Sequence, residues 1–229
     1  MSRKILVVAA HPDDEVLGCG GAILKHIEFG DIVHTIIMAE GLTSRDCCRD
    51  VVGRADGLSE LHQTAKKVAD FIGVEKLIMN NFPDNRMDSV ALLDVVKTIE
   101  REVDEFQPDV VYTHHAGDVN VDHRVTHDAV ITACRSLPGE SVREILFFET
   151  LSSTEWQMMT ADKIFQPNVY VDITKQINKK IKALELYNSE MREYPHPRSY
   201  EGVKILAQYR GLTVGCPYGE AFMLGRSIR

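Results

Sequence analysis

The chain has 229 residues, which is enough for one sizeable hydrophobic core and marginal for two. Its net charge is −8, and the sequence contains no stretch rich in basic residues. We therefore expect neither nucleic acid nor an anionic membrane surface as a partner. No apolar run approaches the roughly 20 residues of a membrane span, and five cysteines without paired spacing indicate free thiols.

The first predicted element is a strand at residues 4–9, a continuous apolar run that suits the centre of a parallel sheet. The run is shorter than the usual signal-peptide core of ~7–15 residues, and it stops at an acidic segment. We therefore expect no leader peptide and a cytoplasmic protein.

Apolar runs alternate with helical patterns along the rest of the chain. The further strands are expected at residues 32–38, 76–79, 110–113, 144–148 and 169–172. The helices are expected at residues 20–29, 58–72, about 88–106, 123–136, about 174–188 and about 200–209. A polar loop is expected at residues 41–57, and the region from about 190 to 229 is expected to be irregular apart from its one helix.

This alternation predicts an α/β fold, with a mostly parallel sheet and helices on both faces, in a single domain over residues 1–229. Such sheets bind ligands beyond the carboxyl ends of the strands, near the point where the strand order reverses. The strands at 4–9 and 110–113 flank that point in the usual order, and a polar cluster follows each of them. We therefore expect the two clusters to meet in one crevice.

The first cluster is HPDDE at residues 11–15, and the second lies between residues 114 and 127. His11, Asp14 and His123 form a possible two-histidine, one-carboxylate set for zinc, whose catalytic sites use three protein ligands and keep a place for water. Side chains of neighbouring residues tend to diverge, so Asp13 is expected to face the attacking water as the general base.

Several alternatives stay open. The first cluster could merely cap a helix, because Asp is a good N-cap and Glu suits a helix N-terminus. His127 lies four residues after His123 and could share its helical face, but His123 is nearer the crevice. Asp122, the neighbour of His123, is expected to orient a histidine ring without itself binding the metal. Nitrogen and oxygen donors also suit divalent ions other than zinc.

AHPDDE at residues 10–15 closely resembles the first motif of the PIG-L/LmbE-like deacetylases. DHR at 122–124 is similar to that family's second motif, and EAF at 220–222 to its terminal region. The resemblance implies a Rossmann-like three-layer sandwich, one zinc ion, and removal of the N-acetyl group from an N-acetylglucosamine-type sugar, nucleotide- or lipid-linked sugars included. It also implies His11, Asp14 and His123 as ligands and Asp13 as base.

The chain departs from the family pattern at one position of the second cluster. Many members carry a histidine three positions before the last ligand, where this chain has Asn120. An amide can donate a hydrogen bond to the oxyanion but cannot supply a proton, and His115 or His196 is expected to compensate. Substrate contacts are expected from Arg54, His196 and Arg198, because a guanidinium matches phosphate or carboxylate groups.

The sequence therefore predicts a zinc-dependent N-deacetylase acting on a small N-acetylated sugar. The alternatives are a zinc amidohydrolase for a non-sugar N-acyl compound, and a metal- or sugar-binding module without turnover, which Asn120 favours. A nicotinamide-dependent dehydrogenase would need a GxGxxG fingerprint, which GCGG at residues 18–21 does not match. Nothing in the sequence excludes a homo-oligomer.

Overall fold

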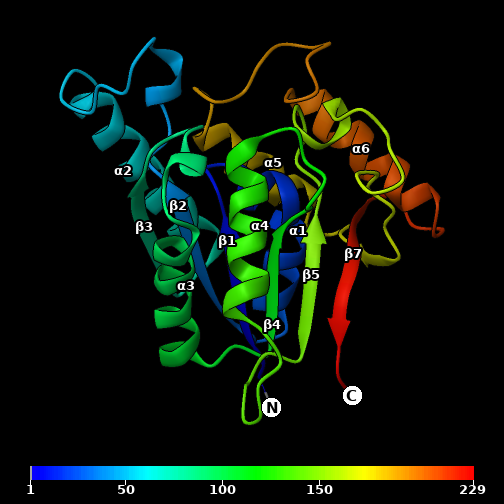
Figure 1. Ribbon diagram of the computed structural model, residues 1–229. Helices are drawn as coiled ribbons and strands as arrows, with labels where there is room; N and C mark the ends of the chain where they lie inside the picture. The colour runs from blue at the N-terminus through cyan, green and yellow to red at the C-terminus, as the bar shows by residue number, and fades with distance from the viewer. Residues whose placement is uncertain (1) are drawn as a thin grey trace.

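A computed structural model describes residues 2–229 and shows a sheet with helices on both faces (Figure 1). The sheet has seven strands in the order β3-β2-β1-β4-β5-β7-β6. They are β1 (Lys4–Ala9), β2 (Ile32–Ala39), β3 (Lys76–Phe82), β4 (Val110–His114), β5 (Glu144–Phe148), β6 (Val169–Asp172) and β7 (Gly219–Ser227). Strands β1 to β5 pair in parallel, whereas β7 is antiparallel to β5 and β6. The predicted α/β fold with a mostly parallel sheet is confirmed.

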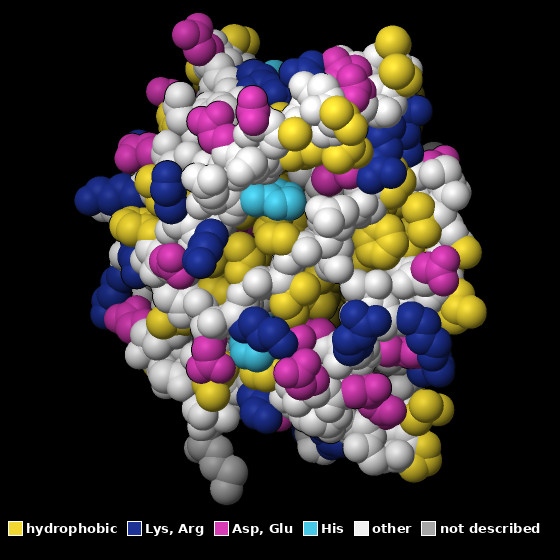
Figure 2. Space-filling model, turned by 90° about the vertical axis from the view of Figure 1, so that its left-hand side faces the viewer, with side chains coloured by type: hydrophobic (Ala, Val, Ile, Leu, Met, Phe, Trp, Pro, Cys, Tyr) yellow, Lys and Arg dark blue, Asp and Glu magenta, His cyan; other side chains and the backbone are white. Residues whose placement is uncertain are grey.

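The helices divide into two layers, each with its own hydrophobic core. They are α1 (Asp14–Glu28), α2 (Ala55–Ile72), α3 (Leu92–Phe106), α4 (Val121–Ala133), α5 (Ile177–Leu186) and α6 (Tyr200–Leu212). One core packs beneath α1, α2 and α5, and the other beneath α3 and α4. Among residues 2–229, no helix is both long enough and apolar enough to span a bilayer. On the α2 and β3 side of the molecule, acidic and basic side chains are interspersed (Figure 2).

Strand β1 shows why the sheet is central to both cores. Ile5, Val7 and Ala9 pack into the core beneath α1, whereas Leu6 and Val8 pack into the core beneath α3 and α4. Successive side chains of a strand point to opposite faces, so a strand covered on both sides must be apolar at every position. This is the continuous apolar run that the sequence shows.

The structure differs from the sequence prediction at two elements near the site. Helix α1 begins at Asp14, six residues before the predicted start at residue 20, because the acidic motif itself forms the first turn. The region expected to be irregular contains strand β7 as well as helix α6. Strand β7 has only a short apolar run, Ala221–Leu224, and its place beside β5 depends on contacts distant in sequence.

Helix α1 is broken at Cys19, whose backbone angles are not helical. Glu220 of β7 accepts hydrogen bonds from the backbone N–H groups of residues 21 and 22, both at 2.7 Å. Lys180 of α5 donates to the carbonyl of Leu17 at 2.9 Å and pairs with Glu220 at 2.7 Å. Both side chains are buried. The pair therefore supplies the hydrogen bonds that the break removes from the helix.

We predict that Glu220→Gln destabilises the protein by about 3 kcal/mol or more, because it leaves the Lys180 ammonium buried without a counter-charge. Urea unfolding followed by circular dichroism measures the change. Lys97→Met is the control, because this side chain is exposed and its ion pair with Glu100 contributes little. Equal urea midpoints for Glu220→Gln and the wild type would show that the pair does not hold the broken helix.

Candidate metal centre and active site

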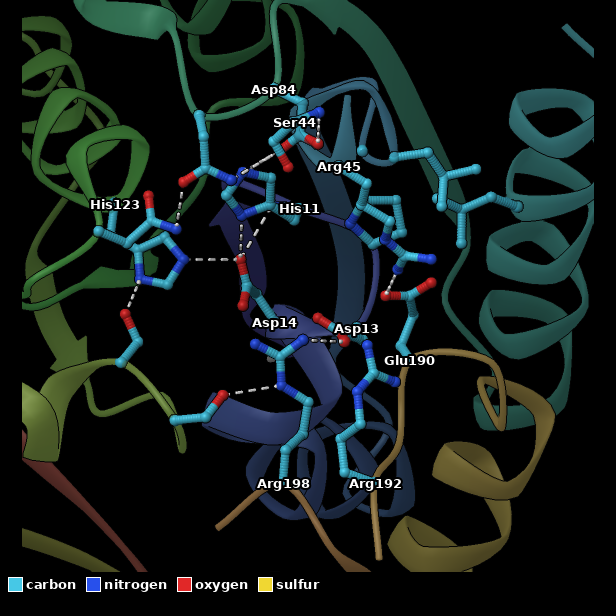
Figure 3. Close-up of a pocket in the computed structure, with 18 residues that line it drawn as sticks. His11, Asp13, Asp14, Ser44, Arg45, Asp84, His123, Glu190, Arg192 and Arg198 are labelled. Carbon is cyan, nitrogen blue, oxygen red and sulfur yellow. Dashed lines mark hydrogen bonds and ion pairs between the residues drawn. The ribbon is translucent and has the colours of Figure 1, made fainter. Parts of the chain in front are cut away.

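A pocket of about 220 Å³ lies at the carboxyl ends of the central strands (Figure 3). Strands β1 and β4 are neighbours, and the loop after β1 and the start of α4 both reach this pocket. It is lined by His11, Pro12, Asp13, Asp14, Gly41, Leu42, Ser44, Arg45, Leu61, Asp84, Asn85, Asn120, His123, Ser152, Ser153, Glu190, Arg192 and Arg198. The two polar clusters of the sequence thus meet where the strand order reverses, the position at which such sheets bind ligands.

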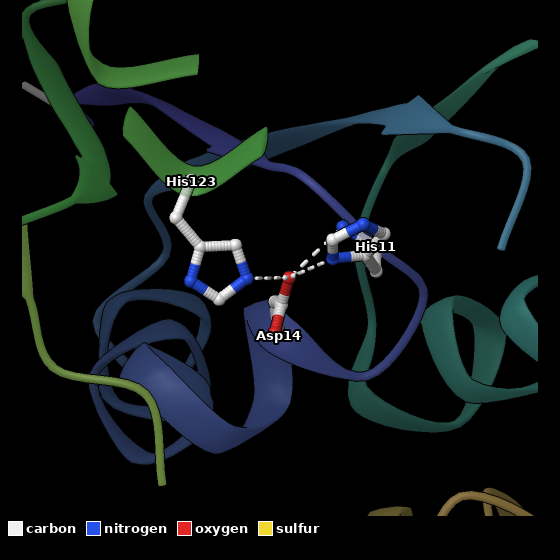
Figure 4. Close-up of side chains that lie close together, drawn as sticks. All are labelled: His11, Asp14 and His123. Atoms are coloured by element: carbon white, nitrogen blue, oxygen red, sulfur yellow. Dashed lines mark hydrogen bonds and ion pairs between the residues drawn. The ribbon is translucent and has the colours of Figure 1, made fainter. Parts of the chain in front are cut away.

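His11, Asp14 and His123 converge on one side of the pocket (Figure 4). Asp14 Oδ2 lies 3.2 Å from His11 Nδ1 and 3.2 Å from His123 Nε2. One donor atom from each of the three residues can be chosen so that all lie within 4.8 Å of one another. Two imidazole nitrogens and a carboxylate oxygen are ligands that zinc accepts in catalytic sites, so these residues fit that ion.

A second group of possible donors is His11 with Asp84 and Asp122. Asp122 Oδ2 lies 2.9 Å from His11 Nε2, and the same carboxylate accepts backbone N–H bonds from Asn85 at 2.6 Å and Met87 at 2.9 Å. The two backbone N–H groups hold the Asp122 carboxylate in place, and the carboxylate in turn fixes the His11 ring so that its Nδ1 faces Asp14. The ring that Asp122 contacts is that of His11, and not that of its sequence neighbour His123.

The ring of His123 is held instead by Asp118. Its Nδ1 lies 3.2 Å from Asp118 Oδ2, and that carboxylate also accepts hydrogen bonds from the hydroxyls of Ser153 and Thr154. Burial alone would lower the pKa of His123, but the charges of Asp14 and Asp118 outweigh it and raise the pKa to about 9. Buried carboxylates thus surround this position and favour a positive charge there.

Asp13 is held in a strained turn at the start of α1. Its φ of 105° lies in the left-handed region, which costs a non-glycine residue about 1–3 kcal/mol. The Asp13 N–H donates to Glu15 Oε2 at 3.0 Å, and Glu15 Oε1 accepts from the Tyr187 hydroxyl at 2.9 Å. These hydrogen bonds connect Tyr187, the residue that follows α5, to the acidic motif at the start of α1. They fix the turn that directs the Asp13 side chain into the pocket.

The carboxyl of Asp13 is buried beside an arginine. Arg198 Nη1 lies 3.3 Å from Asp13 Oδ2. Burial raises the pKa of Asp13 well above its ordinary value, and the nearby charge of Arg198 opposes that rise. A buried carboxyl whose pKa is raised above its ordinary value is suited to general acid–base catalysis.

Of the two residues expected to contact the substrate from this segment, Arg198 lines the pocket and His196 does not. The Arg198 side chain donates from Nε to the Ser152 hydroxyl at 2.9 Å. His196 Nδ1 accepts the backbone N–H of Arg198 at 3.1 Å, and its ring lies edge-on to Trp156. His196 is outside the pocket lining, so it supports the Arg198 loop rather than contacting a ligand in the pocket.

Two other predicted site residues do not reach the pocket. The ring of His115 donates from Nε2 to the carbonyl of Lys163 at 2.9 Å. The adjacent His114 is the one that stacks on His123, with ring centroids 3.9 Å apart. Arg54 forms an exposed ion pair with Asp46 at 2.6 Å, outside the pocket lining. Neither the oxyanion role of His115 nor the substrate role of Arg54 agrees with these positions.

Asn120, the remaining predicted residue, caps α4 at the edge of the pocket. Its Oδ1 accepts the N–H of Asp122 at 2.8 Å, and its Nδ2 donates to Asn85 Oδ1 at 3.0 Å. An amide nitrogen carries two hydrogens, so one N–H remains for a ligand. Asn120 can therefore donate a hydrogen bond in the pocket but cannot transfer a proton.

Two charged residues of the pocket lining, Asp84 and Glu190, were not predicted from the sequence. Asp84 follows β3, and the rule that ligands gather at the carboxyl ends of strands would have indicated it. Glu190 follows α5 in a segment without a recognisable pattern, and it pairs with Arg45 at 2.6 Å. Only the folded chain shows that both line the pocket.

The sequence model of the PIG-L family, described as GlcNAc-PI de-N-acetylase, matches residues 6–134. The chain belongs to this family. It is 28% identical over 193 residues to the uncharacterized deacetylase YaiS of Escherichia coli (strain K12), covering 82% of this chain and 91% of that protein.

Two solved structures share the fold. The N,N'-diacetylchitobiose deacetylase from Pyrococcus horikoshii has a TM-score of 0.77 and 23% identity, covering 98% of this chain and 84% of that one. The 4-carboxy-2-hydroxymuconate hydratase from Pseudomonas putida KT2440 has a TM-score of 0.75 and 22% identity, covering 99% and 98%. At this identity the likeness shows the fold, and two different reactions occur on it.

Proposed function

We propose that this chain is a zinc-dependent N-deacetylase that hydrolyses the acetamide of an N-acetylglucosamine-type sugar. The observation that carries the proposal is the convergence of His11, Asp14 and His123 in a pocket that also contains the carboxyl of Asp13. The description of the family and the named activity of the diacetylchitobiose deacetylase support the acetyl group and the sugar.

His11, Asp14 and His123 would hold the ion, because their donor atoms lie close together and are of the types that zinc prefers. Bound zinc polarises a carbonyl group and lowers the pKa of water to about 7. Asp118 and Asp122 contribute by holding the two imidazole rings from behind, which fixes the direction of the donor nitrogens.

Asp13 supplies the proton transfers. Its carboxylate accepts a proton from the attacking water and returns it to the departing nitrogen, so that one water and one acetamide give acetate and a free amine. Arg198, 3.3 Å away, keeps the carboxyl directed into the pocket. The remaining N–H of Asn120 is our proposed donor to the oxygen on which negative charge develops.

We predict that Asp14→Ala and His123→Ala lose most of their bound zinc, whereas Asp84→Asn retains one ion. Asp14 and His123 belong only to the first group of donors, and Asp84 belongs only to the second. Elemental analysis after dialysis against zinc-containing and then zinc-free buffer measures the content. The reverse pattern would place the ion between His11, Asp84 and Asp122.

We predict that Asp13→Asn keeps its zinc but releases acetate from N-acetylglucosamine and N,N'-diacetylchitobiose about 10²–10⁴ times more slowly, because an amide cannot accept the proton. His115→Gln is the control, since this ring faces Lys163 and should leave the rate nearly unchanged. A rate for Asp13→Asn equal to that of the wild type would remove Asp13 as the base.

The same assay separates the other functions that the sequence left open. Acetate release from N-acylated peptides but from no sugar would favour a non-sugar amidohydrolase. Zinc binding without release from any N-acyl compound would favour a binding module.

A further inference from the structure

Glu190 lies in the wall of the active-site pocket and is only 8% exposed. Its Oε2 accepts a hydrogen bond from Arg45 Nη2 at 2.6 Å. Its Oε1 is buried and has no hydrogen-bond partner among the described residues. In Figure 3, Glu190 and Arg45 lie together on the side of the pocket opposite His123.

A buried carboxylate oxygen without a donor is costly, because it has lost its contact with water. Such an atom in a native pocket calls for an explanation. Arg45 fixes the carboxylate through Oε2, so Oε1 is the atom left for a ligand. A ligand that offers a hydrogen-bond donor at this wall would satisfy it.

The charges around the pocket decide which kind of donor fits. A cationic group at Oε1 would lie beside the Arg45 guanidinium, which is already bound to Glu190. The other charged side chains of the lining are Arg192, Arg198, Asp13, Asp14 and Asp84. A phosphate or carboxylate would face Glu190 itself and Asp13 nearby. Arg45 and Arg198 are already paired with these two carboxylates. An uncharged donor, a hydroxyl group, avoids both repulsions.

We propose that Glu190 is a substrate-recognition residue whose Oε1 accepts a hydrogen bond from a hydroxyl group of the sugar. The pocket then selects an uncharged, hydroxyl-bearing unit at this wall. The inference deepens the proposed deacetylase function, on which it rests, because it places the sugar in the same pocket as the donor atoms of His11, Asp14 and His123.

The test pairs enzyme variants with substrates that lack single hydroxyl groups. Wild type, Glu190→Ala and Glu190→Gln are compared for kcat/KM of acetate release on N-acetylglucosamine and its 3-deoxy, 4-deoxy and 6-deoxy analogues. Glu193→Gln is the matched control, because this neighbouring glutamate is exposed and lies outside the pocket lining. Circular dichroism confirms that each variant is folded.

We expect the wild type and Glu193→Gln to reject one deoxy analogue by about 10²-fold or more, since a site built around a substrate hydroxyl strongly discriminates against its loss. Glu190→Ala should reject the same analogue less than about 10-fold, having lost the partner of that hydroxyl. Glu190→Gln, which keeps one carbonyl oxygen, should lie between them and tests the proposal if the alanine variant does not fold. Identical analogue ratios in all variants would overturn the proposal.

Calorimetric titration with N-acetylglucosamine separates this inference from the proposed function. If the wild type binds the sugar more tightly than Glu190→Ala but releases no acetate, recognition by Glu190 stands and the deacetylase function fails. If acetate is released and both proteins bind the sugar equally, the deacetylase function stands and the role of Glu190 fails.

Discussion

The site depends on one shared contact, in which the carboxylate oxygen Oδ2 of Asp14 lies between the rings of His11 and His123. Asp14 opens α1 directly after β1, and His123 lies in the first turns of α4 after β4. The contact therefore exists because β1 and β4 are neighbours at the reversal of strand order. Two further carboxylates, Asp122 and Asp118, hold the rings so that their remaining nitrogens face Asp14. The orientation of each ring is thus fixed by a second carboxylate in addition to Asp14, as a preorganised metal centre requires.

Residues 135–229, which lie beyond the family match, hold the N-terminal acidic motif in place. Tyr187 supports Glu15, which in turn binds the N–H of Asp13. Lys180 and Glu220 bridge the break in α1 one turn further along the helix. These contacts come from the buried faces of α5 and β7, together with the residue that follows α5. The acidic motif can keep a strained turn at its second residue because buried groups distant in sequence compensate for the strain.

The predictable parts of the molecule are those that depend on local pattern. The apolar run of β1 and the position of the polar clusters after two strands predicted the fold and the crevice in which the clusters meet. Side-chain direction was not predictable in the same way. His115 was expected to have a role in the site, but His114 is the residue whose ring lies beside His123. The two rings lie in different places because adjacent residues at the end of a strand point to opposite sides. The position of Arg54 outside the pocket lining was not predictable either, because its pairing with Asp46 becomes apparent only in the folded loop.

The fold alone does not decide the reaction, since a deacetylase and a hydratase of other chemistry both share it. The unmet requirements of the pocket are more informative. Asp13 is balanced by Arg198, and one oxygen of Glu190 is balanced by Arg45. Under the proposed function two requirements then remain: a cation among the donors around Asp14, and a hydrogen-bond donor at the other oxygen of Glu190, which has no partner among the described residues. A divalent ion and a sugar hydroxyl, as proposed above, would meet these requirements together on opposite walls of one pocket. The acetamide of a bound amino sugar would then lie between them, within reach of Asp13, so substrate recognition and proton transfer become parts of one arrangement.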